Sequence, residues 1–150
     1  MRSSVLTMIV SLAAACSSGS SSSTARAVPA DEAAEVLIDR NWLDVWPQSK
    51  DERLHVYRFT PAMGGGVFQD RTLFKGTFEL FRFEVEGTTL EFELPETEQR
   101  VRTSFRIDRV EGPKPFDLRL TLEESPRGPT VYYGRSAETG ADWIGPVGQP

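Results

Sequence analysis

The chain has 150 residues, of which 39% are hydrophobic and 26% are charged, values that are ordinary for one soluble domain. Its net charge of −5 argues against nucleic-acid binding, which normally requires a basic surface. The single cysteine excludes an internal disulfide and a Cys-x-x-Cys site, and the single histidine excludes a metal site built from several histidines. We therefore expect no metal and no cofactor, while the oligomeric state stays open.

The N-terminus has the features of an export signal. Arg2 supplies a positive charge, residues 5–12 form an apolar core, and residues 13–15 are small. The small residues end at Cys16, so this segment resembles the lipobox of bacterial lipoproteins, although alanine stands at position 13 where that pattern prefers leucine. The resemblance implies that residues 1–15 are removed and that Cys16 receives acyl chains, palmitate among them. The alternative is ordinary cleavage after Ala15, which would leave a free thiol.

A Ser-rich stretch follows the cysteine. It can bury little apolar surface, so we interpret residues 16–28 as a lipidated cysteine followed by a flexible tether. Several acyl chains on one residue would hold the protein at a membrane, whereas a single chain would bind only marginally. Residue 17 is serine rather than the aspartate that resembles an inner-membrane retention signal. We therefore expect the protein in the cell envelope, on the periplasmic face of the outer membrane if the bacterium has two membranes.

The rest of the chain is predicted to be one domain at residues 29–135, followed by a mobile tail at 136–150 in which Trp143-Ile144 could dock on the domain. Asp31 is expected to cap a short helix that ends near Asp39. After the helix, the hydrophobic period changes to two and turn signals recur every 8–12 residues, a pattern typical of all-β proteins. The expected strands are residues 41–46, 54–60, 66–70, 76–86, 89–94, 99–110, 116–123 and 129–134.

The pairing of the central strands can be predicted from two short loops. A two-residue turn at Gly87-Thr88 would place Phe83 opposite Phe92 and Val85 opposite Leu90. The next loop, residues 95–98, would place Phe92 opposite Val101. The same register sets Glu93 beside Arg82 and Arg100, and Glu91 beside Arg102, on the other face. One register thus satisfies an apolar face and a charged face together.

An antiparallel series of eight strands has open edges unless it closes on itself. We therefore predict an all-β fold, an eight-stranded antiparallel up-and-down barrel preceded by a short helix. A two-sheet sandwich is the competing architecture, and the regular hairpin spacing favours the barrel.

Several short motifs between residues 36 and 135 resemble those of lipocalin-like (calycin) domains. They are Asn41-Trp42-Leu43, His55-Val56-Tyr57-Arg58-Phe59-Thr60 with Gly64-Gly65-Gly66, Phe83 to Leu90, Leu118 to Leu122, and Tyr132-Tyr133-Gly134-Arg135. The resemblance implies that Arg135 packs over Trp42 as a cation–π contact and closes the barrel floor. The sequence departs from the family at Arg40, where lipocalins have glycine.

The inward side chains form the candidate binding site. An apolar pocket in the mouth of a barrel could hold a small hydrophobic or amphipathic molecule, and a packed core would use the same residues. The lone His55 is either a polar group in that pocket or a hydrogen-bonded core or mouth residue, and no residue is placed by spacing to form a catalytic triad with it. The predicted ligand-binding residues are His55, Tyr57, Phe59, Phe81, Phe83, Phe92, Thr103 and Phe105.

We expect a non-catalytic protein. The preferred role is binding of a small hydrophobic molecule inside the barrel, and the alternative is an interaction module with a filled barrel that acts through its charged surface. On that surface Arg100, Arg102 and Arg106 should point outward, where they face either an anionic partner or the neighbouring glutamates.

Overall fold

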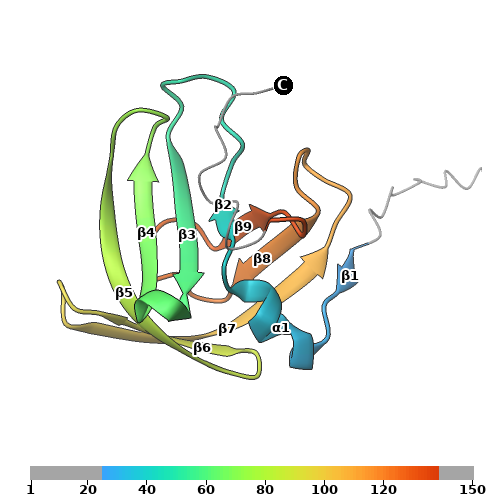
Figure 1. The fold of residues 1–150 in the computed structure, drawn as a ribbon, viewed down its shortest axis with the longest axis vertical. Coiled ribbons are helices and arrows are strands. Elements are labelled where there is room, and N and C mark those ends of the chain that lie inside the picture. The colour runs from blue at the N-terminus through green and yellow to red at the C-terminus, as the bar shows by residue number, and fades with distance from the viewer. Residues whose placement is uncertain (1–24, 139–150) are drawn as a thin grey trace, which may run out of the picture.

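The computed structural model describes residues 25–138, and in it eight antiparallel strands close into a barrel (Figure 1). Each strand pairs with the next, and β9 returns to pair with β2 through Leu43 and Tyr133. The predicted up-and-down barrel is confirmed. Its strands are β2 (Asn41–Leu43), β3 (Leu54–Thr60), β4 (Gly65–Arg71), β5 (Gly76–Glu86), β6 (Thr89–Leu94), β7 (Gln99–Arg109), β8 (Leu118–Leu122) and β9 (Val131–Gly134).

The predicted register of β5, β6 and β7 is confirmed. Phe83 pairs with Phe92, and Phe92 pairs in turn with Val101. On the outer face Glu93 pairs with both Arg82 and Arg100. This register places the apolar side chains of the three strands inside the barrel and the charged side chains outside, because side chains alternate between the two faces along a strand.

Ordered pairing begins before residue 29, where we had placed the start of the domain. Strand β1 (Arg26–Ala27) pairs with Arg109 and Asp108 of β7. The last residue of β7 that pairs with β6 is Ser104, so β1 occupies the edge that β6 leaves open. The amide of Val28 then donates to the carbonyl of Ile107 at 2.8 Å, and the Val28 side chain is buried. Such a short pairing leaves no periodic pattern in the sequence.

Helix α1 (Ala30–Leu37) closes one end of the barrel (Figure 1). It buries Ala33 and Leu37 against the core. The predicted cap is wrong, because Pro29 occupies the N-cap position and no side chain caps the helix. Asp31 lies instead in the first turn, where a negative charge interacts favourably with the helix dipole. In residues 25–138 no helix has both the length and the apolar content needed to span a membrane.

Several strand boundaries differ from the prediction by a few residues. Strand β2 ends at Leu43 rather than 46. At the next pair the Asp44 amide still donates to the His55 carbonyl at 3.1 Å, but the His55 amide donates to the Asp44 carboxylate at 2.7 Å instead of to a backbone carbonyl. Strand β4 begins at Gly65 rather than 66 and ends at Arg71 rather than 70, and the turn before it contains the 3-10 helix η1 (Pro61–Met63). The predicted last two strands are each shortened, to β8 and β9.

The first residues of the predicted tail pack on the barrel. Glu138 accepts hydrogen bonds from the backbone and side-chain amides of Asn41, and its carboxylate lies 3.6 Å from Arg58. Burial raises the pKa of Glu138. Ser136 donates its amide to Asp117 at 2.7 Å. Residues 136–138 therefore pack on the barrel, contrary to the prediction of a mobile tail from 136, whereas Trp143-Ile144 lies outside the described residues, as do the export signal and Cys16.

Candidate functional site: the barrel interior and the loop that closes it

Most of the predicted ligand-binding residues meet inside the barrel. Phe59 of β3 and Phe92 of β6 are fully buried, and Phe81 and Phe83 of β5 lie between them. The ring centroids of Phe81 and Phe92 are 5.3 Å apart, and those of Phe59 and Phe83 are 5.2 Å apart. Tyr57 contacts Phe59, Phe81 and Phe92 at 5.7–5.8 Å. These separations are those of rings in direct contact, so the rings pack against one another inside the barrel.

The two predicted site residues of β7 also belong to the core. Phe105 is 3% exposed and packs in the same hydrophobic cluster. The hydroxyl of Thr103 accepts the amide of Glu124 at 2.8 Å and donates to the carbonyl of Ser104 at 3.2 Å. Thr103 therefore uses its polar group to fix the backbone after β8.

His55 is a hydrogen-bonded residue at the barrel mouth. Its Nδ1 lies 2.6 Å from a carboxylate oxygen of Asp44, and its ring stacks on Phe68 with centroids 5.9 Å apart. Asp70 lies on the other side of the ring, 3.9 Å from Nε2. The guanidinium of Arg53, which binds Asp70, lowers the pKa of that carboxyl. The ring is thus held by acidic partners that sequence spacing did not reveal.

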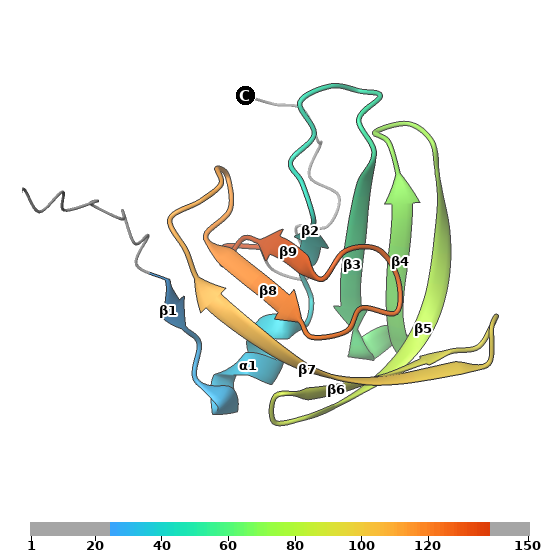
Figure 2. The same ribbon diagram turned by 180° about the vertical axis from the view of Figure 1, so that it is seen from behind.

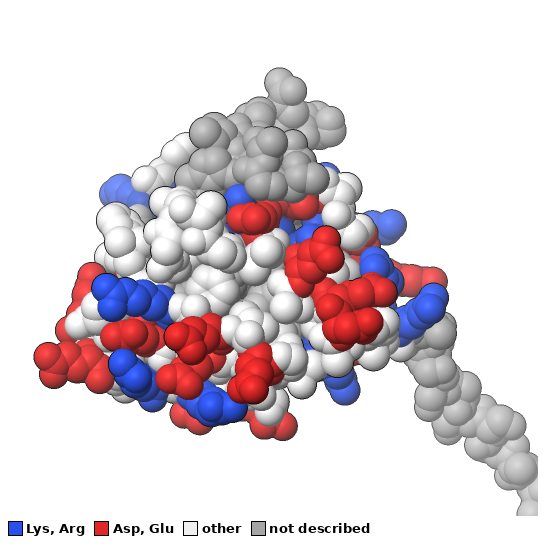
Figure 3. Space-filling view, turned by 60° about the horizontal axis from the view of Figure 1, so that its bottom comes forward, with Lys and Arg blue, Asp and Glu red and all other residues white. Residues whose placement is uncertain are grey.

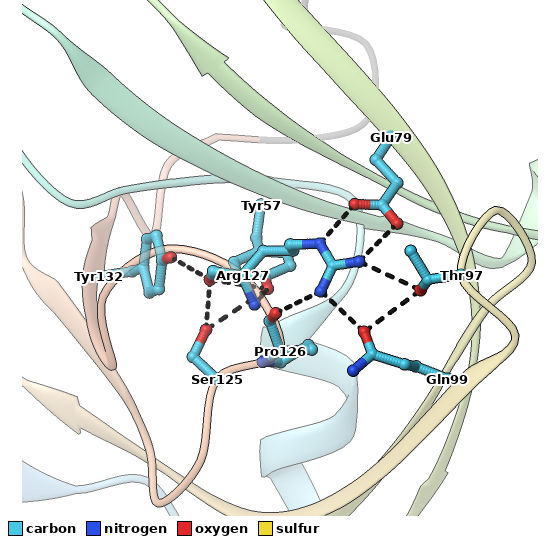
Figure 4. A network of polar contacts seen from close by, with 8 residues as sticks. All are labelled: Tyr57, Glu79, Thr97, Gln99, Ser125, Pro126, Arg127 and Tyr132. Carbon is cyan, nitrogen blue, oxygen red and sulfur yellow. Dashed lines mark hydrogen bonds and ion pairs between the residues drawn. The ribbon is translucent and has the colours of Figure 1, made fainter.

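A loop between β8 and β9 crosses the barrel in front of β3 and β4, and its central residue is Arg127 (Figures 2 and 4). The guanidinium forms a two-bond ion pair with Glu79 of β5, at 2.7 and 3.1 Å. It also donates to Gln99 at 3.0 Å and to Thr97 at 3.2 Å. We call residues 123–130 the strap, because these bonds tie the loop to β5, to the turn between β6 and β7, and to the first residue of β7.

The backbone of Arg127 is held from inside the barrel. Its amide donates to the Tyr57 hydroxyl at 3.1 Å, and the same hydroxyl donates to the Arg127 carbonyl at 3.0 Å. The carbonyl also accepts hydrogen bonds from Ser125 and from Tyr132. Tyr57 was expected to offer its hydroxyl to a ligand, and in the structure that hydroxyl holds the strap closed (Figure 4).

Alkaline pH should weaken this closure. Burial raises the pKa of Tyr57 from its usual 10 to about 12, and burial also raises that of Tyr132. The folded state binds the Tyr57 proton more tightly than the unfolded chain does. The protonated Tyr57 hydroxyl therefore stabilises the fold fully below pH 10, and this stabilisation is lost between pH 10 and 12. A shift of this size corresponds to about 2–3 kcal/mol.

We expect urea titrations to show that the free energy of unfolding decreases between pH 9 and 12. In Tyr57→Phe the part of this decrease that comes from Tyr57 should be absent. The variant should itself cost about 1–3 kcal/mol at neutral pH, because the half-buried Arg127 amide loses its acceptor. A variant with the same pH profile as the wild type would show that Tyr57 does not hold its proton in this way.

The barrel floor is closed around Trp42. This side chain is fully buried, and its indole nitrogen donates to the Leu37 carbonyl at 2.8 Å. Its ring lies against Gly134, where a Cβ would come within 3.0 Å of it. Arg135 was expected to pack over Trp42, but it is exposed, and its carbonyl accepts a hydrogen bond from Arg40 at 2.9 Å. The residue before Arg135, Gly134, makes a close contact with the tryptophan.

Comparisons of the chain with protein-family models, curated proteins and solved structures find no match. Among residues 25–138, no group of three or more His, Cys, Asp and Glu side chains is arranged to hold a metal ion. The site is an aromatic core that the strap closes from one side.

Proposed function

We propose that the protein is a non-catalytic envelope lipoprotein with a lipocalin-like barrel, and that it acts on a partner through its outer surface. The observation that supports this proposal is the packing of the interior: the inward rings contact one another, and the strap ties its backbone to Tyr57. We infer from this packing that the barrel is filled. A carrier of a small hydrophobic molecule would need that space. Of the two roles expected from the sequence, the packing favours the interaction module.

The charged part of the outer surface neutralises itself. Glu93 lies 3.7 Å from both Arg82 and Arg100, and Arg102 lies 3.5 Å from Glu86 and 3.9 Å from Glu91. Basic and acidic side chains accordingly lie side by side on this face (Figure 3). Exposed pairs of this kind contribute roughly 0.2–1 kcal/mol each to stability and create no strong field of one sign. The charges of β5, β6 and β7 therefore favour solubility more than attraction of a charged partner.

The outer face of β4 and β5 offers a better surface for a partner. Phe78 and Leu80 of β5 point outward and are 69% and 57% exposed, and Met63 of η1 is 82% exposed. Val67 of β4 pairs with Leu80. We call these four residues the apolar stripe. Contiguous exposed apolar surface commonly marks a place of interaction.

The predicted anchor, Cys16, precedes β1 in the sequence. Strand β1 lies across the barrel from β5 (Figures 1 and 2). A chain held at a membrane by Cys16 could therefore present the apolar stripe away from its point of attachment.

Lipidation itself has a direct test. Cys16→Ala should move the protein from the membrane fraction to the soluble fraction, because the acyl chains have no other residue to attach to. Ser18→Ala changes the same segment without touching the thiol and should leave the protein on the membrane. Unchanged membrane association of Cys16→Ala would contradict the anchor.

The surface-acting role is tested by titrating the Cys16→Ala protein with medium- and long-chain fatty acids in a calorimeter. We expect no saturable one-to-one binding, because the aromatic core leaves no room. If fatty-acid binding is weakened by Phe59→Leu but not by Leu80→Ser, the ligand lies inside the barrel and the proposal is overturned. If it is weakened by Leu80→Ser but not by Phe59→Leu, the ligand lies on the apolar stripe and the proposal is supported.

A further inference from the structure

The exposed large hydrophobic side chains of the described chain gather in one place. Among residues 25–138 they are Met63, Phe74, Phe78 and Leu80. All of them lie in β5 or in the turns at the two ends of β4. Three belong to the apolar stripe, and Phe74, which is 76% exposed, adds an aromatic side chain beyond its end, in the turn between β4 and β5.

That turn also brings positive charge to the end of the stripe. The guanidinium of Arg71 donates to one side-chain amide oxygen and to two backbone carbonyls, and not to a carboxylate. Lys75 is exposed, as is Lys50, whose carbonyl accepts a backbone amide of the turn. The ion pairs within the described chain include none of these three cations, although Asp51 and Glu52 follow Lys50 in the sequence. The turn therefore presents charges that a partner can neutralise.

The arginines on the next strands differ in this respect. Arg82 of β5 and Arg100 of β7 both lie 3.7 Å from the carboxylate of Glu93, and Arg106 lies 3.2 Å from Asp108. A cation that already has a carboxylate beside it gains little from a second one. The charges that remain available next to the stripe are accordingly those of the β4–β5 turn.

The opposite end of the stripe contains a hollow that is suited to a large side chain. It has a volume of about 290 Å³, and Met63, Val67 and Leu80 contribute to its wall. Gly65 lines it as well, at a position where a Cβ would collide with the backbone of β5. This volume is at the lower end of the range for ligand sites, about 300–1,000 Å³, which fits one or two large side chains. Aromatic and large aliphatic side chains seated in such pockets commonly provide most of the affinity of an interface.

The two features have a fixed spacing. Lys75 immediately precedes β5, and Leu80 is the fifth residue after it. At about 3.3 Å per residue, a strand covers about 16 Å over that interval. A partner that uses both ends of the stripe therefore needs a segment about 16 Å long, which is about 11 residues of α-helix or about five residues of extended chain.

A second copy of this chain does not have the matching charge. A two-fold contact of stripe on stripe uses the same patch on both copies, so the patch would need acidic side chains of its own. The acidic residues of β4 and of the β5 segment 76–82 are Asp70 and Glu79. They are turned toward the inner face, where they bond Arg53 and Arg127.

The membrane that holds the predicted anchor is on the wrong side of the barrel for this surface. Strand β1, which follows the anchor in the sequence, lies across the barrel from β5 (Figures 1 and 2). A lipid surface would also make no use of a hollow with room for one or two side chains. These observations favour a protein as the occupant.

We propose that the apolar stripe binds a segment of another protein that carries a large hydrophobic side chain and, about 16 Å from it, acidic residues. The hydrophobic side chain enters the hollow beside Leu80, and the acidic residues meet Arg71, Lys75 and Lys50 at the β4–β5 turn. The inference rests on the proposed function, which assigns the stripe to a partner, and adds the chemistry of that partner.

Three labelled synthetic peptides test this chemistry on the Cys16→Ala protein. Each has about 14 residues, enough to cover the stripe as a helix, with one tryptophan near one end. The other end carries three glutamates in the first peptide, three glutamines in the second and three lysines in the third. Fluorescence anisotropy should show that the glutamate peptide binds at least about tenfold more tightly than the lysine peptide, and that the difference shrinks in about 0.5 M salt.

Variants of the protein locate the binding. Leu80→Ser should weaken binding of the glutamate peptide at least about tenfold, because it removes a wall of the hollow. Lys75→Glu should weaken it about threefold to tenfold by placing like charges together. Lys114→Glu is the matched control: it makes the same change of charge at an exposed position between β7 and β8, and it should leave the affinity unchanged. All three positions are exposed, so the variants should fold.

The possible results separate the partner's chemistry from the proposed function. If the three peptides bind equally and Leu80→Ser weakens them all, the acidic chemistry is overturned while the role of the stripe stands. Equal effects of Lys75→Glu and Lys114→Glu would also overturn the acidic chemistry, since they would reflect net charge alone. No binding of the glutamate peptide at about 1 mM, an affinity weaker than about −4 kcal/mol, would overturn it as well.

The other two occupants have their own signatures. If the Cys16→Ala protein binds none of the peptides but binds vesicles that contain phosphatidylglycerol, and Leu80→Ser abolishes that binding, the occupant is a membrane and the proposal is overturned. A concentration-dependent dimer in sedimentation experiments that Leu80→Ser abolishes would identify a second copy and overturn it too. None of these results depends on whether the barrel is filled, which the fatty-acid titration measures.

Discussion

Replacing Phe92 by alanine is expected to lower the free energy of unfolding by about 3–5 kcal/mol, the cost of removing a large buried aromatic side chain. Phe92 is fully buried and contacts Tyr57, Phe59 and Phe81. Urea denaturation at neutral pH measures the loss. Phe78→Ala removes the same side chain from a position that is 69% exposed and should change stability by less than about 0.5 kcal/mol.

The Phe92→Ala variant also tests whether the interior is full. An apolar cavity made by truncation stays dry and can bind a small aromatic molecule such as benzene. Benzene should therefore raise the melting temperature of Phe92→Ala but not that of the wild type. Benzene that stabilises both proteins equally would indicate a cavity already present in the wild-type barrel.

Replacing Arg127 by methionine is expected to cost about 2–4 kcal/mol. The ion pair with Glu79 is largely removed from solvent, with side chains that are 25% and 15% exposed. Loss of one partner of a fully buried pair costs about 3–5 kcal/mol, and the partial exposure of this one reduces the figure. The remaining Glu79 would be left as an uncompensated charge under the strap.

A double-mutant cycle isolates that contribution. Glu79→Met in the Arg127→Met background removes the stranded carboxylate and should recover part of the lost stability. Arg82→Met breaks the exposed pair with Glu93 and should cost less than about 1 kcal/mol. Additive effects of Arg127→Met and Glu79→Met would contradict a strap held by their ion pair.

The barrel could be predicted from the sequence because its constraints are local and repeated. One two-residue turn at Gly87-Thr88 set the register of β5 against β6, and that register explained an apolar face and a charged face at once. Strands β3, β5 and β6 accordingly have the predicted bounds. The inward aromatic residues were found for the same reason, since alternation along a strand assigns them to one side.

The strap could not be predicted, because loops have no period and Arg127 acts on residues far away in the sequence. One signal was present: Glu79 is a charged residue in the inward series Glu79, Phe81, Phe83, Val85, and an inward carboxylate needs a cation. Strand β1 and the Asp44–His55 contact depend likewise on tertiary placement. The sequence therefore predicted the strands of the barrel, but not the strap and the tertiary contacts that close it.

The most direct test of the filled barrel is the native mass of the protein purified from the envelope of its own host, before and after organic extraction. We predict one mass, that of the chain with its covalent lipid, and no change on extraction. A discrete additional mass that extraction removes, and that returns on incubation with the extract, would contradict the account. It would show that the aromatic interior opens for a ligand and that the protein is a carrier.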